Sequence, residues 1–164
     1  DQGDYWWELR PCDYYCEFEK EKIIWQEMSN EPSFAYDKKR FLINQTAYMI
    51  TGNNLKYIIA ILNSRVSMWY MQNTAYSLSK GAQRWIKQYV ERVPIPPIKN
   101  EQIVNPIINL VDQILDITES QGYEQDQNKQ KKVKEFTEKI DELVYKLYDL
   151  TDEEKSIIKE LVYI

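Results

Sequence analysis

Hydrophobic residues in the first third of the chain lie in short apolar runs separated by polar clusters, a pattern typical of strands and turns. Two runs, 5–9 and 22–28, are rich in aromatic and β-branched residues and predict β-strands. A hairpin is predicted next, with strands over 33–36 and 41–43 and a charged turn over 37–40. A further strand over 46–51 leads to Gly52.

The pattern changes to a helical period after Gly52, with an Asn of 53–54 as N-cap. Apolar residues then recur at spacings of three and four and predict one long amphipathic helix. They are Leu55, Ile58, Ile59, Leu62, Val66 and Trp69. Residues 84–92 predict a short helix that Pro94 stops, and 93–98 alternates proline with apolar residues and predicts an extended segment.

The last third has two apolar seams with alternating spacings of four and three, which predict two antiparallel helices. The seams consist of Ile103, Ile107, Leu110, Ile114 and Ile117, and of Val133, Phe136, Ile140, Leu143, Leu147 and Leu150. A polar loop over 118–129 joins them. Thr151 and Glu154 form a capping box for a final short helix, with Ile157, Ile158, Leu161 and Val162 facing inward.

Together these elements predict an α+β fold. A β-containing domain with one amphipathic helix is expected over 1–98, and a helical hairpin with a short last helix over 99–164. Thirteen Tyr and five Trp against four Gly exclude a low-complexity chain. No apolar run reaches the roughly 18 residues of a membrane span, and the first residues do not read as a signal peptide. We therefore expect a cytoplasmic protein, and the missing initiator Met suggests a piece of a longer chain.

The sequence offers little for catalysis or for cofactor binding. It contains no His, which weakens any mechanism that needs a general base at neutral pH. Cys12 and Cys16 lack the further ligands that zinc requires, and the four glycines form no phosphate-binding loop. We expect no catalytic residue, no cofactor site and no metal site in this chain.

The distribution of charge is more informative than the net charge of −5. Residues 38–99 contain ten basic residues and one acidic residue, Glu91, while acidic residues predominate on both sides. A basic block of this kind is expected where one face meets phosphates, although an ordinary solvated surface is the alternative.

Two segments of this block have side chains suited to DNA. In the first, Ser77, Ser79, Lys80 and Lys87 suit phosphates, Gln83 can pair with adenine and Arg84 with guanine, and Gly81 permits a close approach. In the second, the tip of the predicted hairpin presents Lys38, Lys39 and Arg40, with Asn44 nearby. The alternatives are that Arg84 pairs with an acid of the helical region, that 38–40 is a solvated turn, and that Trp85 and Tyr89 belong to the core.

Several motifs in order resemble the TaqI-like C-terminal specificity domain of adenine-N6 DNA methyltransferases and of restriction enzymes fused to them. The central ones are Leu62-Asn63-Ser64-Arg65, Met68-Trp69-Tyr70-Met71, the run 81–89 and Val93-Pro94-Ile95-Pro96-Pro97-Ile98. Segments 7–12, 22–27, 57–64 and 140–151 extend the resemblance over nearly the whole chain.

The resemblance implies a domain that selects a double-stranded DNA sequence and performs no chemistry. A preceding methyltransferase domain of the same chain would bind S-adenosylmethionine and methylate adenine, and the parent enzyme could also cleave DNA. Asn105-Pro106-Ile107-Ile108 lacks the second proline and the aromatic residue of the methylation motif, so it is not that motif. The helical region would be a spacer or would contact another domain or subunit. The alternative is a helical protein–protein interaction module that does not contact DNA.

Overall fold

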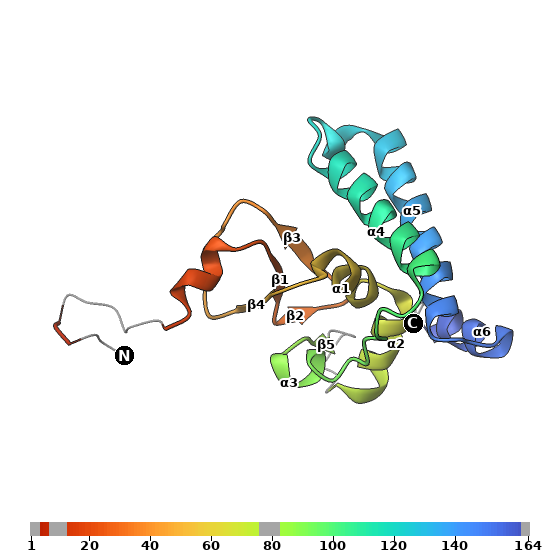
Figure 1. Ribbon diagram of the computed structural model, residues 1–164, viewed down its shortest axis with the longest axis horizontal. Coiled ribbons are helices and arrows are strands. Elements are labelled where there is room, and N and C mark those ends of the chain that lie inside the picture. Colours follow the sequence, from red (N-terminus) through yellow and green to blue (C-terminus); the bar gives the residue numbers. More distant parts are fainter. Residues whose placement is uncertain (1–3, 7–12, 76–82, 162–164) are drawn as a thin grey trace.

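Strand β1 (Lys22–Gln26) is the central strand of a three-stranded antiparallel sheet with the order β3-β1-β4. Its isoleucines and tryptophan favour extended backbone and are mostly buried. The outer strands are β3 (Ala35–Asp37) and β4 (Ala47–Thr51). The structure is a computed structural model that describes residues 4–6, 13–75 and 83–161 (Figure 1).

The register of the sheet gives it two distinct ends. Lys22 lies opposite both Asp37 and Thr51, whereas Gln26, at the other end of β1, lies opposite Ala47. Just beyond that end, β2 (Met28–Ser29) pairs with β5 (Gln83–Arg84) in a second, two-stranded sheet. Segments far apart in the sequence are thereby joined next to Gln26.

The helices follow the predicted order, and the α+β class is confirmed. Those of the described residues are α1 (Leu55–Leu62), α2 (Arg65–Thr74), α3 (Lys87–Val90), α4 (Glu101–Thr118), α5 (Gln127–Leu147) and α6 (Asp152–Leu161), with 3-10 turns η1 (Tyr15–Glu19) and η3 (Tyr123–Gln125). None of the helices in these ranges is long and apolar enough to cross a membrane.

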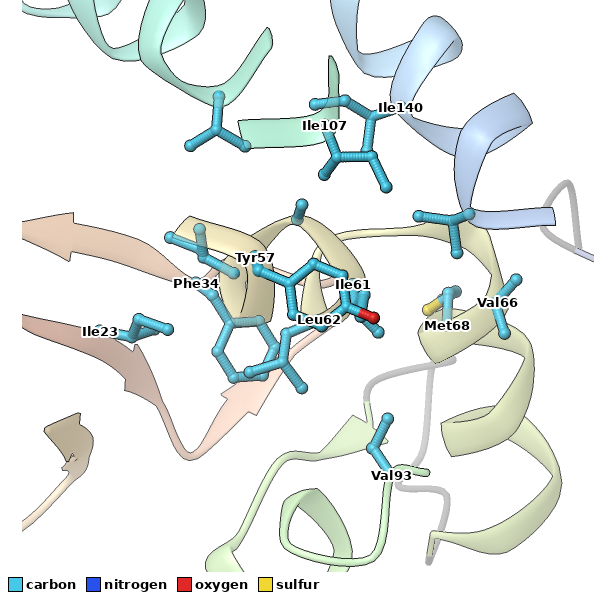
Figure 2. Packing of buried hydrophobic residues seen from close by; sticks show 14 of the residues in the cluster. Ile23, Phe34, Tyr57, Ile61, Leu62, Val66, Met68, Val93, Ile107 and Ile140 are labelled. Carbon is cyan, nitrogen blue, oxygen red and sulfur yellow. The ribbon is translucent and has the colours of Figure 1, made fainter. Parts of the chain in front are cut away.

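Helix α1 lies at the centre of the hydrophobic core. Figure 2 shows Tyr57, Ile61 and Leu62 of α1 near Ile23 and Phe34 of the sheet region, with Ile107 and Ile140 of the helical region above them. One cluster of buried side chains therefore includes residues on both sides of residue 98. The division of the chain into domains 1–98 and 99–164 stays a prediction.

The single long helix predicted from Leu55 to Trp69 is wrong, because the chain breaks into α1 and α2 at Asn63 and Ser64. Ser64 is extended, and its hydroxyl accepts a hydrogen bond from the N–H of Ser67, which caps α2. The side-chain amide of Asn63 binds a segment outside the helices: it accepts from the N–H of Phe34 (3.0 Å) and donates to the carbonyl of Phe34 (2.9 Å). Asn54 is the N-cap residue of α1, but its side chain makes no capping hydrogen bond.

The helical region agrees closely with the prediction. Helices α4 and α5 run antiparallel, side by side (Figure 1), and Asp126 caps α5 by accepting from the N–H groups of Asn128 and Lys129. The capping box is confirmed, since the side chains of Thr151 and Glu154 each accept from the other's backbone N–H. Asn105 and Pro106 lie inside α4. In the last helix Ile158 is buried, but Ile157 is half exposed, so its predicted inward position is wrong.

The predicted hairpin around residues 37–40 is also wrong. β3 pairs with β1, and 41–43 forms no strand. The reason is Asp37, whose carboxylate accepts from the N–H groups of Lys39 (2.7 Å) and Phe41 (2.9 Å) and turns the chain away. Of the strand predicted over 5–9, residues 5 and 6 lie in a bend and a turn, and 7–9 are outside the described residues.

Candidate nucleic-acid interface

Arg84 lies on a short strand that two tryptophans fix to the sheet. The backbone N–H of Trp85 donates to the Glu27 carbonyl (2.7 Å), and its indole N–H donates to the Ser29 carbonyl (3.2 Å). The indole of Trp25 donates in turn to the Trp85 carbonyl (2.6 Å). Trp85 is buried, which confirms its interpretation as a core residue. Arg84 is therefore presented from a rigid support.

The Arg84 guanidinium forms an ion pair with the carboxylate of Glu27. An acid of the helical region was the alternative partner predicted for Arg84, but the partner is Glu27, which follows β1. The pair lies at the surface, with 43% of the Arg84 side chain and 24% of the Glu27 side chain exposed. The hydrogen bond to Glu27 raises the pKa of Arg84 above its usual value, so the arginine stays charged.

The short helix predicted over 84–92 is largely replaced by other structure. Residues 83–84 are the strand β5, and only 87–90 form the single turn α3. Pairing with β2 and the Trp85 hydrogen bonds explain the difference, because both depend on residues more than fifty positions away. Lys87 begins α3 and is exposed, and Tyr89 is partly buried against the core.

The turn with Lys38, Lys39 and Arg40 lies at the opposite end of the sheet from Arg84. It follows Asp37, which pairs with Lys22, whereas Arg84 lies beyond Gln26. At a rise of about 3.3 Å per residue, the length of β1 separates the two ends by roughly 13 Å. The two candidate segments thus form separate places on the surface.

A buried ion pair supports the turn. The Lys22 ammonium contacts the Asp37 carboxylate at 2.6 Å, and both side chains are almost completely buried. Lys22 also donates to the Phe18 carbonyl (2.8 Å). Burial opposes the charge of Asp37, but hydrogen bonds from Lys22 and from two backbone N–H groups hold the pKa of Asp37 below its usual value. Arg40 has a positive φ of 61° in the resulting turn.

Asn44 lies at the Arg84 end of the sheet, although it was grouped with 38–40. Its side chain accepts from the N–H (3.0 Å) and the hydroxyl (2.7 Å) of Thr46. The Thr46 carbonyl accepts from the N–H of Glu27, the partner of Arg84. The loop 41–46 therefore runs from the basic turn to the Arg84 end.

Half of the basic block is paired with acidic residues from its flanks. The ion pairs are Lys38 with Glu119, Arg40 with Glu19, Lys56 with Asp112, Arg65 with Asp141 and Arg84 with Glu27. Within the ranges that the structure describes, Lys39, Lys87, Arg92 and Lys99 are exposed and have no ion pair. Three of these four cations follow Arg84 within fifteen residues, so this segment has most of the unpaired cations of the basic block that the structure describes.

Most of the predicted contacts before Arg84 lie outside the described residues. Ser77, Ser79, Lys80 and Gly81 lie outside the described residues, and Gln83 is described only as the backbone partner of Ser29. In the described part of the chain, no three His, Cys, Asp or Glu side chains lie close enough to hold a metal ion. The charge pattern did not distinguish Arg92 or Lys99 from the rest of the basic block, and Glu27 lies outside that block. An acid directly after a buried strand was the only signal for Glu27.

The sequence model of the TaqI-like C-terminal specificity domain matches residues 4–95, more than half of the chain. The chain belongs to this family. A specificity domain is a non-catalytic domain. The matched range of this specificity domain includes the whole sheet, the Trp25–Trp85 contact, Arg84 and Lys87.

Proposed function

We propose that this domain recognises a specific sequence in double-stranded DNA for a type II restriction–modification enzyme. The observation that carries the proposal is the group of unpaired cations after Arg84, within or close to the matched part of a specificity domain. Duplex DNA attracts such a group through its phosphates. An arginine at the edge of the group has the donors needed to distinguish guanine.

The contacts divide into two kinds. Lys87, Arg92 and Lys99 would bind phosphates and fix the position of the domain on the duplex. Arg84 would contact a base edge from its fixed strand, with Asn44 beside it. Lys38, Lys39 and Arg40 would contact the backbone at the other end of the sheet, roughly 13 Å away, a separation close to the width of a major groove, about 12 Å. Ser77, Ser79, Lys80, Gly81 and Gln83 stay predicted contacts.

We further propose that a methyltransferase domain of the same chain supplies the chemistry, with S-adenosylmethionine as its methyl donor and adenine-N6 as its target. No group of this domain takes part in that step. The helical region would hold the recognition surface in place, because Asp112 of α4, Glu119 at the end of α4 and Asp141 of α5 neutralise three cations of the basic block. A contact of these helices with another domain or subunit stays a prediction.

The proposal is tested by selecting bound duplexes from a random library at two salt concentrations and sequencing them. We expect enrichment of one motif and an affinity that falls steeply with salt. Salt-sensitive binding without a motif would contradict recognition of a specific sequence by this domain, and would mean that specificity needs the catalytic domain. Absence of binding at both concentrations, with concentration-dependent self-association, would favour the helical interaction module instead.

Arg84→Ala tests the placement of base recognition within that experiment. We expect it to relax the preference at one position of the motif, at a cost of about 1–3 kcal/mol for the preferred base. Lys87→Ala is the matched comparison, because it should weaken binding to all sequences by a similar factor. Equal loss of preference in both variants would contradict the assignment of Arg84 as the base-reading residue.

A further inference from the structure

Glu27 is held unusually firmly for a residue between two short strands. Its backbone N–H donates to the Thr46 carbonyl (3.0 Å), and its carbonyl accepts from the N–H of Trp85 (2.7 Å). Both backbone groups are therefore tied to residues that adjoin strands, Thr46 just before β4 and Trp85 just after β5. Its carboxylate binds Arg84 from a half-buried position, with 24% of the side chain exposed. The position of this carboxylate is set by the sheet.

The ion pair leaves most of the Arg84 donors free. The described contact joins one guanidinium nitrogen, Nη2, to one carboxylate oxygen, Oε1 of Glu27. A guanidinium has five N–H donors in a planar fork, so a second edge remains for another acceptor. With 43% of its side chain exposed, Arg84 can be reached by a further acceptor from outside.

A carboxylate at a surface that binds DNA has an electrostatic cost, since it repels phosphate. It also cancels the charge of Arg84, which lowers the attraction of this residue for any phosphate, whatever the base sequence. Lys87 and Arg92 nearby in the chain carry no such partner. Arg84 thus differs from its basic neighbours in having its charge neutralised and its orientation fixed.

We propose that Glu27 determines specificity by positioning Arg84. The carboxylate keeps the guanidinium from binding phosphates and directs its free edge to one base. This inference rests on the proposed function, because it requires Arg84 to contact DNA. It adds a positioning residue that contacts no base and that sequence reasoning did not identify.

The test measures the affinity of wild type and Glu27→Gln for the selected motif, for the motif changed at the Arg84 position and for a scrambled duplex. We expect Glu27→Gln to bind the scrambled duplex roughly threefold or more tightly and with a steeper salt dependence, because a cation is released. We expect its discrimination at the Arg84 position to fall about five- to tenfold. A role confined to folding would not strengthen binding to any DNA.

Glu91→Gln is the matched control. Glu91 is exposed, lies in the same basic segment and has no ion pair among the described residues, so its substitution adds the same charge. It should raise affinity for all duplexes and leave discrimination unchanged. Thermal unfolding of each variant checks the fold, and Glu27→Gln preserves both backbone hydrogen bonds.

The outcomes separate this inference from the proposed function. If wild type selects no motif, the proposed function is wrong. If wild type selects a motif that Arg84→Ala relaxes, but Glu27→Gln and Glu91→Gln behave alike, the function stands and the role of Glu27 is wrong. Loss of discrimination in Glu27→Gln but not in Glu91→Gln supports the positioning role. In that case, the double variant should discriminate at the Arg84 position no worse than Arg84→Ala alone.

Discussion

The two ends of the sheet carry basic residues in different ways. At the Lys22 end, a buried ion pair fixes the backbone of the turn, while Lys38 and Arg40 reach acids of other elements across the surface. At the Gln26 end, tryptophan side chains fix the strand, and Arg84 is held by Glu27 next to it. The first end fixes a main chain that bears long flexible cations. The second fixes the cation itself.

This difference matters because affinity and specificity make different demands on a side chain. A phosphate contact tolerates a flexible lysine, since it needs charge and little geometry. A base contact needs a donor pair held in a fixed orientation, and supporting groups must supply that orientation. On this basis the Gln26 end is suited to base recognition and the Lys22 end to backbone contact.

The largest effect is expected from breaking the buried ion pair. Asp37→Ala leaves the ammonium of Lys22 buried with only the Phe18 carbonyl as partner, which should lower the free energy of unfolding by about 3–5 kcal/mol. Denaturant unfolding measures it. Glu19→Gln is the comparison, because it removes the exposed pair with Arg40 and should change stability little. If both variants lowered the free energy of unfolding equally, the buried Lys22–Asp37 pair would not be what supports the turn.

Next in size is a pH effect at Asp141, which lies at neither end of the sheet. Its pKa is shifted in the opposite direction from that of Asp37. Burial between helices raises the pKa of Asp141 to about 6, although the N–H and guanidinium of Arg65 partly oppose this shift. The folded chain therefore binds this proton more tightly than the unfolded chain. The contribution of Asp141 to the free energy of unfolding, roughly 3 kcal/mol, is present below pH ~4 and is lost as the pH rises through 6.

Asp141→Asn should abolish that fall in stability between pH 4 and 6, as measured by unfolding at several pH values. Asn still offers an oxygen to the N–H of Arg65, which limits structural change. The lowered pKa of Asp37 has the opposite sign, since its contribution is present at higher pH and is lost as the pH falls. If stability depended on pH in the same way in wild type and in Asp141→Asn, the fall between pH 4 and 6 would not be due to Asp141.

A smaller effect is expected when the support of Arg84 is weakened. Trp25→Phe removes the indole donor to the Trp85 carbonyl, so the free energy of unfolding should fall by about 1–3 kcal/mol. Base preference at the Arg84 position should fall as well, because β5 loses an anchor. Tyr36→Phe removes an exposed hydrogen bond to Glu21 and should leave base preference unchanged. Loss of stability without loss of preference would show that β5 keeps its place without this bond.

The smallest effects are expected from single exposed lysines. Lys87→Ala and Lys39→Ala should each reduce the slope of log affinity against log salt by about one, because each removes one phosphate contact. Binding titrations on the selected duplex and on a scrambled duplex measure both slopes. A change for Lys87 and none for Lys39 would confine the interface to the Gln26 end.

Periodicity was sufficient where each element is determined by its own residues. The extents of α4 and α5, the capping box at Thr151 and the strands β1 and β4 all follow from local pattern. The predicted seam of α4 is only partly correct, since the buried residues of this helix are Val104, Ile107 and Val111. Periodicity failed where a distant partner decides the structure. The helix break at Asn63 depends on the backbone of Phe34, and the missing hairpin depends on Lys22 binding Asp37.

The same distinction applies to the candidate site. Charge counting located the basic block, but it did not indicate which cations are paired, because Glu119 lies far along the chain from Lys38. It also grouped Asn44 with 38–40, whereas the register separates them. Sequence alone identifies residues suited to DNA. It does not identify Glu27, whose role depends on a strand pair formed between segments more than fifty residues apart.

The hydrogen bonds of Asn63 to the backbone of Phe34 have a consequence for how the sequences of such domains can diverge. Its amide binds only the main-chain N–H and carbonyl of Phe34, and the Trp25 indole binds only the main-chain carbonyl of Trp85. Hydrogen bonds to main-chain atoms do not depend on which side chains the neighbouring loop carries. Loop residues can therefore be exchanged while the loop stays attached. A scaffold of this kind allows its target sequence to change by substitution, without a new fold.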